Sequence, residues 1–212
     1  FEYWLPSSAY ERLHFIDMNA GGQMLQDDKN VLSEERPRYL MRSIVEEAIT
    51  SSQIEGAATT RAVAKEMLRT GRKPKDYGEK MIYNNYMTVQ KIKDKIREPL
   101  SIALLHELYA EITKDTLEDP SLEGRFRTEQ NEVHDPSDQI VLYTPPPPET
   151  IPEAVARLCE FANEDKGEFI HPVVKAIILH FWFAWIHPYM DGNGRTARAL
   201  FYWYVLKQGY WL

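Results

Sequence analysis

Cysteine is almost absent from this chain of 212 residues, which contains only Cys159. A single thiol cannot form an internal disulfide, so the composition gives no sign of an oxidising compartment. Cys159 lies in an apolar stretch predicted to be helical, with no other feature that would activate a thiolate. We therefore interpret it as a core residue rather than a nucleophile.

Long hydrophobic runs are also missing. The longest, residues 176–186, is interrupted by His180 and is too short to cross a bilayer. No secretory signal pattern precedes it, so we expect a cytoplasmic protein without a membrane partner. The chain begins with Phe1 rather than Met, which is typical of a trimmed or partial polypeptide.

Positive charge is in short supply, because 25 basic residues face 32 acidic ones and the net charge is −7. Binding to the phosphate backbone of DNA or RNA needs an excess of Lys and Arg, so direct nucleic-acid binding is not expected. The shortage is uneven, since residues 169–212 carry four basic residues against one acidic residue and 12 of the 25 aromatic residues. We expect the chemistry in this aromatic, locally positive segment.

Most of the chain shows the apolar periodicity of amphipathic helices, whereas the first thirty residues show no clear pattern. Residues 124–148 differ, because two strand-like runs, 125–128 and 139–143, flank turn residues and a tetraproline stretch follows. The predicted fold is all-α, a helical bundle with a small β-hairpin flap. The predicted helices span residues 40–49, 59–68, 77–96, 102–114 (with Ser101 as N-cap) and 151–163.

Residues 173–186 are apolar almost all round, which predicts a central buried helix. The helix should end at His187, because Pro188 disfavours a helical conformation in the residue before it. A glycine-containing loop, residues 191–195, then leads into a second helix from Arg195 onward. A helix that begins after such a loop has free backbone N–H groups that can bind an anion.

The side chains in and around this loop suit a nucleoside triphosphate. Arg195 and Arg198 are three positions apart on the second helix, and guanidinium groups pair well with phosphate oxygens. Asp191 offers an oxygen ligand for Mg²⁺, and His187 can act as a general base. Each residue taken alone has an ordinary structural explanation. Their combination in one short segment favours phosphoryl or nucleotidyl transfer.

Residues 187–198, His-Pro-Tyr-Met-Asp-Gly-Asn-Gly-Arg-Thr-Ala-Arg, resemble the signature of the Fic family, His-x-Phe-x-(Asp/Glu)-Gly-Asn-Gly-Arg-x-x-Arg. The one departure is Tyr189 in place of the usual phenylalanine, which should perturb packing only mildly. Residues 124–127 and 143–148 resemble the two sides of the family's flap. The resemblance implies a Fic core domain at 76–212, preceded by an N-terminal helical region at 1–75.

This resemblance implies transfer of AMP from ATP to a Tyr, Ser or Thr hydroxyl of a target protein, and of the enzyme itself. His187 would deprotonate the hydroxyl, and Asp191 would hold Mg²⁺ against the phosphates. Arg198 would bind the γ-phosphate and so orient the α-phosphate. The remaining phosphate-binding positions are Gly192, Asn193, Gly194 and Arg195. The flap would pair with an extended target segment through Gln139, Ile140, Val141, Leu142 and Tyr143.

Residues 51–56, Ser-Ser-Gln-Ile-Glu-Gly, are similar to the family's inhibitory motif, (Ser/Thr)-x-x-x-Glu-(Gly/Asn). The regulatory positions are Ser51, Glu55 and Gly56, in an inhibitory helix at about 44–56. Glu55 can pair with Arg198 and so occupy the cation that would bind the γ-phosphate. The alternative interpretation is a helix-end carboxylate followed by a glycine C-cap.

Two other functions compete with autoinhibited AMP transfer. The same site could remove AMP or transfer another phosphate-containing group, with Glu55 positioning a water molecule for the removal. A protein of a different class, an ATP-sensing interaction module without turnover, is disfavoured by the intact His187. The sequence leaves open the target protein, the adenine pocket and the oligomeric state, a homo-oligomer included.

Overall fold

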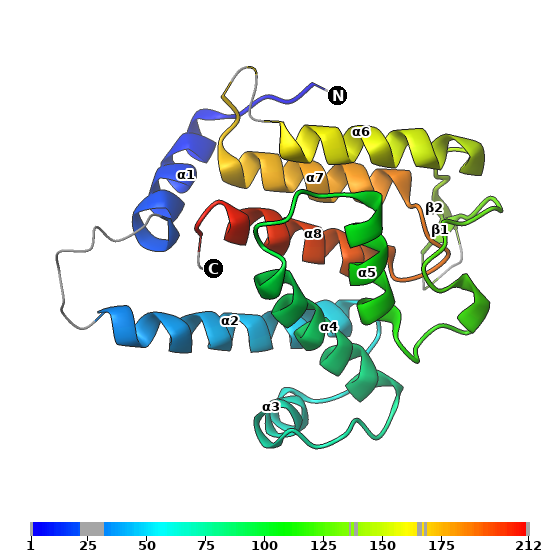
Figure 1. Cartoon of the computed structure of the whole chain (residues 1–212), viewed down its shortest axis with the longest axis horizontal. Helices are drawn as coiled ribbons and strands as arrows, with labels where there is room; N and C mark the ends of the chain where they lie inside the picture. The colour runs from blue at the N-terminus through cyan, green and yellow to red at the C-terminus, as the bar shows by residue number, and fades with distance from the viewer. Residues whose placement is uncertain are drawn as a thin grey trace.

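The computed structural model describes residues 2–21, 32–135, 137, 140–164, 167 and 169–210. Within these residues the chain forms eight α-helices and one two-stranded antiparallel sheet, which confirms the predicted all-α fold with a small hairpin (Figure 1). The helices are α1 Ser7–Ala20, α2 Leu32–Ile54, α3 Arg61–Thr70, α4 Tyr77–Asp94, α5 Ile102–Thr113, α6 Ile151–Asn163, α7 Pro172–Ile186 and α8 Asn193–Lys207. The strands are β1 Val133–His134 and β2 Val141–Tyr143.

Polar caps and glycines determine where several helices begin and end. The Ser101 hydroxyl accepts a hydrogen bond from the Leu104 amide at 3.1 Å, which starts α5 as predicted. The Thr60 hydroxyl accepts one from the Val63 amide at 3.4 Å at the start of α3. Helix α3 ends at Gly71, whose φ of 67° is accessible to glycine without strain. These local signals explain why most helix ends could be predicted closely.

The core forms where four helices meet. Helices α7 and α8 lie side by side, α6 packs along α7, and α5 contacts both α6 and α8 (Figure 1). Their shared core contains the largest fully buried side chains, among them Trp203, Tyr109, Tyr189 and Phe183. Cys159 is buried in this core as expected, and burial raises the pKa of its thiol to about 11.

Helix α2 packs against α4 and also reaches α8, so residues from the N-terminal region lie directly beside the end of the chain. A second, smaller core joins α2, α3 and α4 through Ile49, Met67 and Ile82. Helix α1, which the sequence did not predict, lies near the N-terminus of α7 and the C-terminus of α8. Its Asp17 accepts a hydrogen bond from the Tyr210 hydroxyl at 2.5 Å. The division into 1–75 and 76–212 stays a prediction.

Helix α7 is not buried all round, contrary to the sequence-based expectation. Ile177, Phe181 and Trp185 are 53%, 54% and 37% exposed. They are spaced four residues apart and therefore form one stripe along the helix. The neighbours α6 and α8 cover only part of the helix circumference, so apolar composition alone overestimated its burial. Among the described residues, no helix is both long and apolar enough to span a bilayer.

The hairpin uses a different first strand from the one predicted. Strand β2 lies inside the predicted run 139–143, but its partner is β1, with Val133 opposite Tyr143 and an irregularity before His134 pairs with Val141. The run 125–128 is not a strand. Its Arg127 amide donates instead to the Pro188 carbonyl at 2.9 Å, because this segment packs against the loop between α7 and α8.

Candidate functional site

The loop between α7 and α8 begins at His187, the first residue after α7. His187 has φ 50° and ψ 58°, the left-handed conformation, which is uncommon for a residue with a Cβ. Its amide donates to the Phe183 carbonyl at 3.0 Å and so caps the end of α7. The chain then turns through Pro188–Asp191 and enters α8 at Asn193. His187 therefore lies between the end of one core helix and the start of the next.

Asn193 closes this loop with its side chain. Its Nδ2 donates to the Tyr189 carbonyl at 2.7 Å, and its Oδ1 accepts from the Tyr189 amide at 2.9 Å. The Tyr189 ring is fully buried and stacks on the Tyr109 ring, with centroids 3.6 Å apart and planes 5° from parallel. Its hydroxyl lies 3.1 Å from Nδ1 of His106, so the extra polar atom has a partner in the core. The tyrosine is thereby accommodated at a position where the signature has phenylalanine.

We expect Asn193→Ala to lower the free energy of unfolding by about 2–4 kcal/mol, because it leaves two buried backbone groups of Tyr189 without partners. Asn193 is only 2% exposed, so water cannot easily replace both bonds. Urea denaturation measures the change. The exposed Asn19, whose side chain donates to the Phe15 carbonyl within α1, is a matched control, and Asn19→Ala should change stability by less than about 0.5 kcal/mol. Equal effects of the two substitutions would contradict this role of Asn193.

Two glycines give the loop its shape. Gly192 has φ 75°, and a Cβ there would approach Cγ2 of Thr113 to 2.8 Å, so any other residue would be strained and crowded. A Cβ on Gly194 would collide with Oε1 of Glu55. The side chain of Glu55 therefore lies directly over the first turn of α8, where backbone N–H groups have no acceptor within the helix. An anion bound at that turn would meet this carboxylate.

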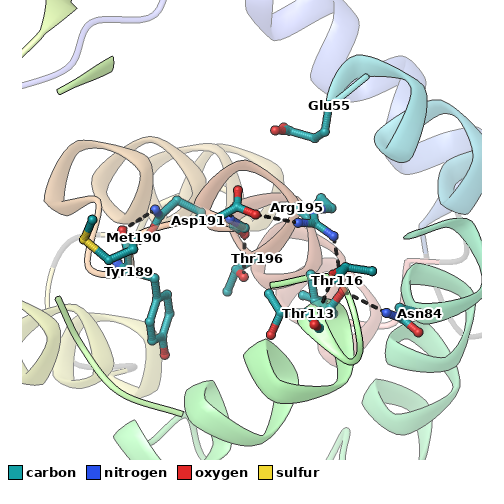
Figure 2. Close-up of polar contacts among 12 residues, drawn as sticks. Glu55, Asn84, Thr113, Thr116, Tyr189, Met190, Asp191, Arg195 and Thr196 are labelled. Carbon is teal, nitrogen blue, oxygen red and sulfur yellow. Dashed lines mark hydrogen bonds and ion pairs between the residues drawn. The ribbon is translucent and has the colours of Figure 1, made fainter. Parts of the chain in front are cut away.

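The two arginines of the signature point to different places. The Arg195 side chain is 1% exposed, and its Nη1 donates to the Ile112 carbonyl of α5 at 3.2 Å. Its Nη2 lies 3.5 Å from Oδ2 of Asp191 (Figure 2). Asn84 of α4 donates to the same Ile112 carbonyl at 3.3 Å. Arg195 thus connects α8 to α5 behind the loop, a contact that helical spacing alone did not reveal.

Asp191 is the exposed carboxylate of the loop, with 56% of its side chain accessible. Its Oδ1 accepts from the Gly192 amide at 2.6 Å, which fixes the carboxylate orientation. Mg²⁺ bound mainly by nucleotide phosphates needs only one or two protein carboxylates. Asp191 fits that requirement, because an accessible oxygen beside the first turn of α8 is available to the ion.

Arg198 faces α2 instead and is paired there. Its Nη2 donates to Oε1 of Glu55 at 2.6 Å, across 143 residues of sequence. Its Nε donates to the Ser51 hydroxyl at 2.7 Å, and Nη2 also donates to the Ser51 carbonyl at 3.1 Å. The side chains of Arg198 and Glu55 are 21% and 30% exposed, so the pair is partly shielded from water. The contact predicted between Glu55 and Arg198 is therefore present.

A glycine turn places Glu55 at the end of α2. The Gly56 amide donates to the Gln53 carbonyl at 3.1 Å and the Ala57 amide to the Ser52 carbonyl at 3.0 Å, with Gly56 at φ 93°. This is the Schellman pattern of helix ends. The C-cap and the ion pair, which the sequence left as alternatives, therefore coexist. The Ser52 hydroxyl also accepts from Asn85 of α4 at 2.8 Å, which ties this helix end to the core.

Glu47 is a residue near Arg198 that the sequence-based prediction missed. It lines a small cavity with Ser51, Arg198 and Tyr202, and burial raises the pKa of its carboxyl group. The spacing of positions 47, 51 and 55 places all three on one face of α2. That spacing is the signal by which the sequence could have identified Glu47.

Electrostatics keep His187 in the form that accepts a proton. Burial lowers the pKa of its imidazole most, and the nearby charge of Arg127 lowers it further. A hydrogen bond to the Ala184 backbone and the charges of Glu55 and Asp191 act in the opposite direction but do not reverse the shift. A lowered pKa means a neutral imidazole at pH 7, as a general base requires.

The hairpin flap lies beside the loop and leaves its outer edge exposed. The Tyr143 hydroxyl donates to the Trp185 carbonyl at 2.8 Å, and Asn131 donates to the Met190 carbonyl at 3.1 Å. Ile140, Val141 and Leu142 are 60%, 44% and 62% exposed. Gln139, the remaining predicted docking residue, lies outside the described residues.

This arrangement of a helix, a glycine loop and a second helix, with a flap beside it, defines a Fic-type site. The model of the Fic/DOC family matches residues 99–205, and the chain belongs to this family. It is 30% identical over 168 residues to "Protein adenylyltransferase Fic" of Drosophila melanogaster, covering 74% of this chain and 31% of the relative. It is also 30% identical over 116 residues to "Protein adenylyltransferase fic-1" of Caenorhabditis elegans, covering 55% and 21%. The chain thus spans less than a third of these relatives.

Solved structures show the same fold. A Fic domain containing signaling protein from Bacteroides thetaiotaomicron superposes with a TM-score of 0.73 at 23% identity, over 96% of this chain and 72% of that one. Fic-1 from C. elegans, residues 134–508, gives a TM-score of 0.74 at 21% identity, over 95% and 59%. Both likenesses cover more of the chain than residues 99–205, and at these identities they show that the fold is shared.

Proposed function

We propose that this protein is an autoinhibited adenylyltransferase that transfers AMP from ATP to a Tyr, Ser or Thr hydroxyl of a target protein and of itself. The observation that carries the proposal is the site at residues 187–198, where a neutral imidazole, an accessible carboxylate and a helix N-terminus lie together. The names of the two curated relatives described above, both protein adenylyltransferases, support the same reaction.

In the proposed reaction, His187 accepts the proton of the target hydroxyl, and the hydroxyl oxygen forms a bond to the α-phosphorus of ATP. The bond from that phosphorus to the oxygen bridging to the β-phosphate breaks, and pyrophosphate leaves. The amides of the first turn of α8 bind phosphate oxygens, with Gly192 and Gly194 leaving room for them. Asp191 would hold Mg²⁺, which neutralises phosphate charge when it is bound.

The role proposed for the Glu55–Arg198 pair is restraint. Arg198 would bind the γ-phosphate, but Glu55 occupies its Nη2 at 2.6 Å and lies over Gly194. ATP bound against this pair would have to give up the contact with Arg198, and its α-phosphate would be misaligned for attack. The exposed edge at Ile140–Leu142 would pair with an extended segment of the target.

The intact mass of the Glu55→Gly protein after incubation with ATP and Mg²⁺ tests the reaction type. A gain equal to one AMP per modified hydroxyl supports AMP transfer, and the same protein without ATP is the control. Nucleotide binding without any gain in mass, on itself or on added proteins, would favour an ATP-sensing module instead.

Removal of AMP is a second candidate, because Glu55 is close enough to His187 for its charge to raise the imidazole pKa. In that reaction Glu55 would position a water molecule against the phosphorus of an AMP-modified hydroxyl. Incubation of AMP-modified protein with the unmutated protein distinguishes AMP removal from AMP transfer. Removal would release free AMP, and this release would require Glu55.

The rate of AMP transfer by Glu55→Gly should remain high below the ordinary histidine pKa of about 6.5. The reaction needs neutral His187, and burial lowers the pKa of its imidazole, so the neutral form is lost only at a more acidic pH. Loss of the Glu55 charge, which raises that pKa, should move the acidic limb further down. Rates at saturating ATP between pH 5 and 8 measure the profile. An acidic limb above the ordinary value would contradict this assignment.

A further inference from the structure

Arg127 is a buried cation held by backbone carbonyl groups. It is 2% exposed, and its guanidinium donates to three carbonyls: Nε to His187 at 2.8 Å, Nη1 to Glu129 at 3.0 Å and Nη2 to Pro146 at 2.5 Å. Its own amide donates to the Pro188 carbonyl at 2.9 Å. One residue therefore connects the backbone at the base to both ends of the flap, Glu129 before β1 and Pro146 after β2.

Burying a guanidinium costs free energy unless its donors find acceptors, and here three backbone carbonyls supply them. The carbonyl of His187 lies just after the C-terminus of α7, where the helix dipole places partial negative charge. The guanidinium complements that charge. It also holds the backbone of His187, which is in the left-handed conformation at φ 50°.

We propose that Arg127 is a positioning residue for His187, which fixes the backbone of the base relative to the flap that would hold the target segment. The proposal rests on the proposed AMP transfer and deepens it. The nucleophile comes from the flap side and the proton acceptor from α7. Because one guanidinium contacts both segments, it holds the target hydroxyl and the His187 imidazole in a fixed relative position, which proton transfer requires.

The geometry of the contacts explains why the residue is arginine. A planar guanidinium can donate in three directions within one plane, whereas a lysine ammonium is a compact charge that cannot reach all three carbonyls at once. Lysine at this position would keep the positive charge near His187 but lose the simultaneous hydrogen bonds to the three carbonyls. Glutamine would lose both. The two substitutions therefore separate positioning from charge.

The test uses the Glu55→Gly protein, with Arg127→Lys or Arg127→Gln added, and Arg125→Gln as the matched control. Arg125 is exposed in the same segment, so its loss removes one nearby positive charge without touching the loop. We expect kcat to fall about tenfold or more in both Arg127 variants, with the KM for ATP changed less than about threefold. Arg125→Gln should leave both kcat and the KM for ATP at the values of the Glu55→Gly protein. Unchanged kcat in folded Arg127 variants would overturn the proposal, as would an effect confined to the KM for ATP.

The pH dependence provides a readout that a merely structural role would not move. The charged groups that act on His187 are Arg127, Glu55 and Asp191, from the flap side, α2 and the loop. In the Glu55→Gly background, Arg127→Gln should move the acidic limb upward, whereas Arg127→Lys should leave it in place. If Arg127→Gln does not fold, the kcat of Arg127→Lys tests the proposal by itself: a fall supports it and an unchanged value overturns it.

A titration without turnover separates this proposal from the proposed function. The His187 imidazole can be followed by NMR, assigned by its loss in His187→Ala. A midpoint that rises in Arg127→Gln supports the link between Arg127 and His187 even if Glu55→Gly transfers no AMP, a result that would contradict only the proposed function. An unchanged midpoint in a folded variant would overturn the link itself.

Discussion

Replacing Glu55 by glycine is expected to raise the initial rate of AMP transfer at least about tenfold, the largest gain that any single substitution should give. A pair at 2.6 Å that is partly shielded from water is a charge-assisted contact, and removing it would free Arg198 for the γ-phosphate in the proposed site. Cations in this role contribute large factors to rates of phosphoryl transfer. Incorporation of labelled AMP into the protein or an added target measures the rate.

Ser51 makes this gain achievable, because two hydrogen bonds from Arg198 to Ser51 survive the substitution and keep the guanidinium beside the loop. Glu46→Gln is the matched control, since Glu46 lies on the same helix but pairs with Lys65 and Arg61 of α3. Its rate should stay that of the unmutated protein. No increase for Glu55→Gly, in a protein that unfolds at its usual temperature, would rule out restraint by Glu55.

His187→Ala, made in the Glu55→Gly background, is expected to lower the rate of transfer by about 10²–10⁴-fold, the size of a lost general base. The affinity for ATP should change less than about threefold, because in the proposed site the backbone amides of α8 and the Arg198 side chain would contact the phosphates, and the imidazole would not. Labelled AMP incorporation measures the first quantity and calorimetric titration with ATP the second.

His14→Ala controls for loss of an imidazole, because His14 is exposed on α1 away from the loop. It should leave both quantities unchanged. Loss of ATP binding by His187→Ala with an intact fold would show that His187 supports nucleotide binding, and its assignment as the base would be wrong. Undiminished transfer would lead to the same conclusion.

Much of the fold follows from local signals. Ser101 and Gly71 mark helix ends because caps and left-handed glycines are encoded by neighbouring residues. Strand β1 could not be predicted, because it has two residues and is stabilised only by β2. The residue types of the run 125–128 favour a strand, but Arg127 bonds to residues 187 and 188, and partners so distant in sequence could not be predicted. Which side of α7 is exposed depends on the positions of the neighbouring helices, and the apolar pattern of the α7 sequence does not contain that information.

In the site too, some features could be predicted from neighbouring residues and others depend on packing between distant elements. The contiguous signature places His187, Asp191 and the glycines together because they lie on one loop. The partner of Arg198 was predicted only through the resemblance of a second short motif. The connection of Arg195 to α5 and the role of Asn193 in closing the loop depend on packing between elements. The sequence places Arg127 only in a segment that resembles one side of the flap, since nothing in its neighbouring residues indicates three carbonyl acceptors.

The side-chain bridge from Asn193 to both backbone groups of Tyr189 has a thermodynamic consequence for ligand binding. These bonds close the loop through the chain's own groups, so the conformational entropy of ordering it belongs to folding and not to binding. In the proposed function, the affinity of this preorganised loop for nucleotide would then be set by its contacts and by competition with Glu55. Weakening the bridge should therefore reduce affinity without removing a single phosphate contact.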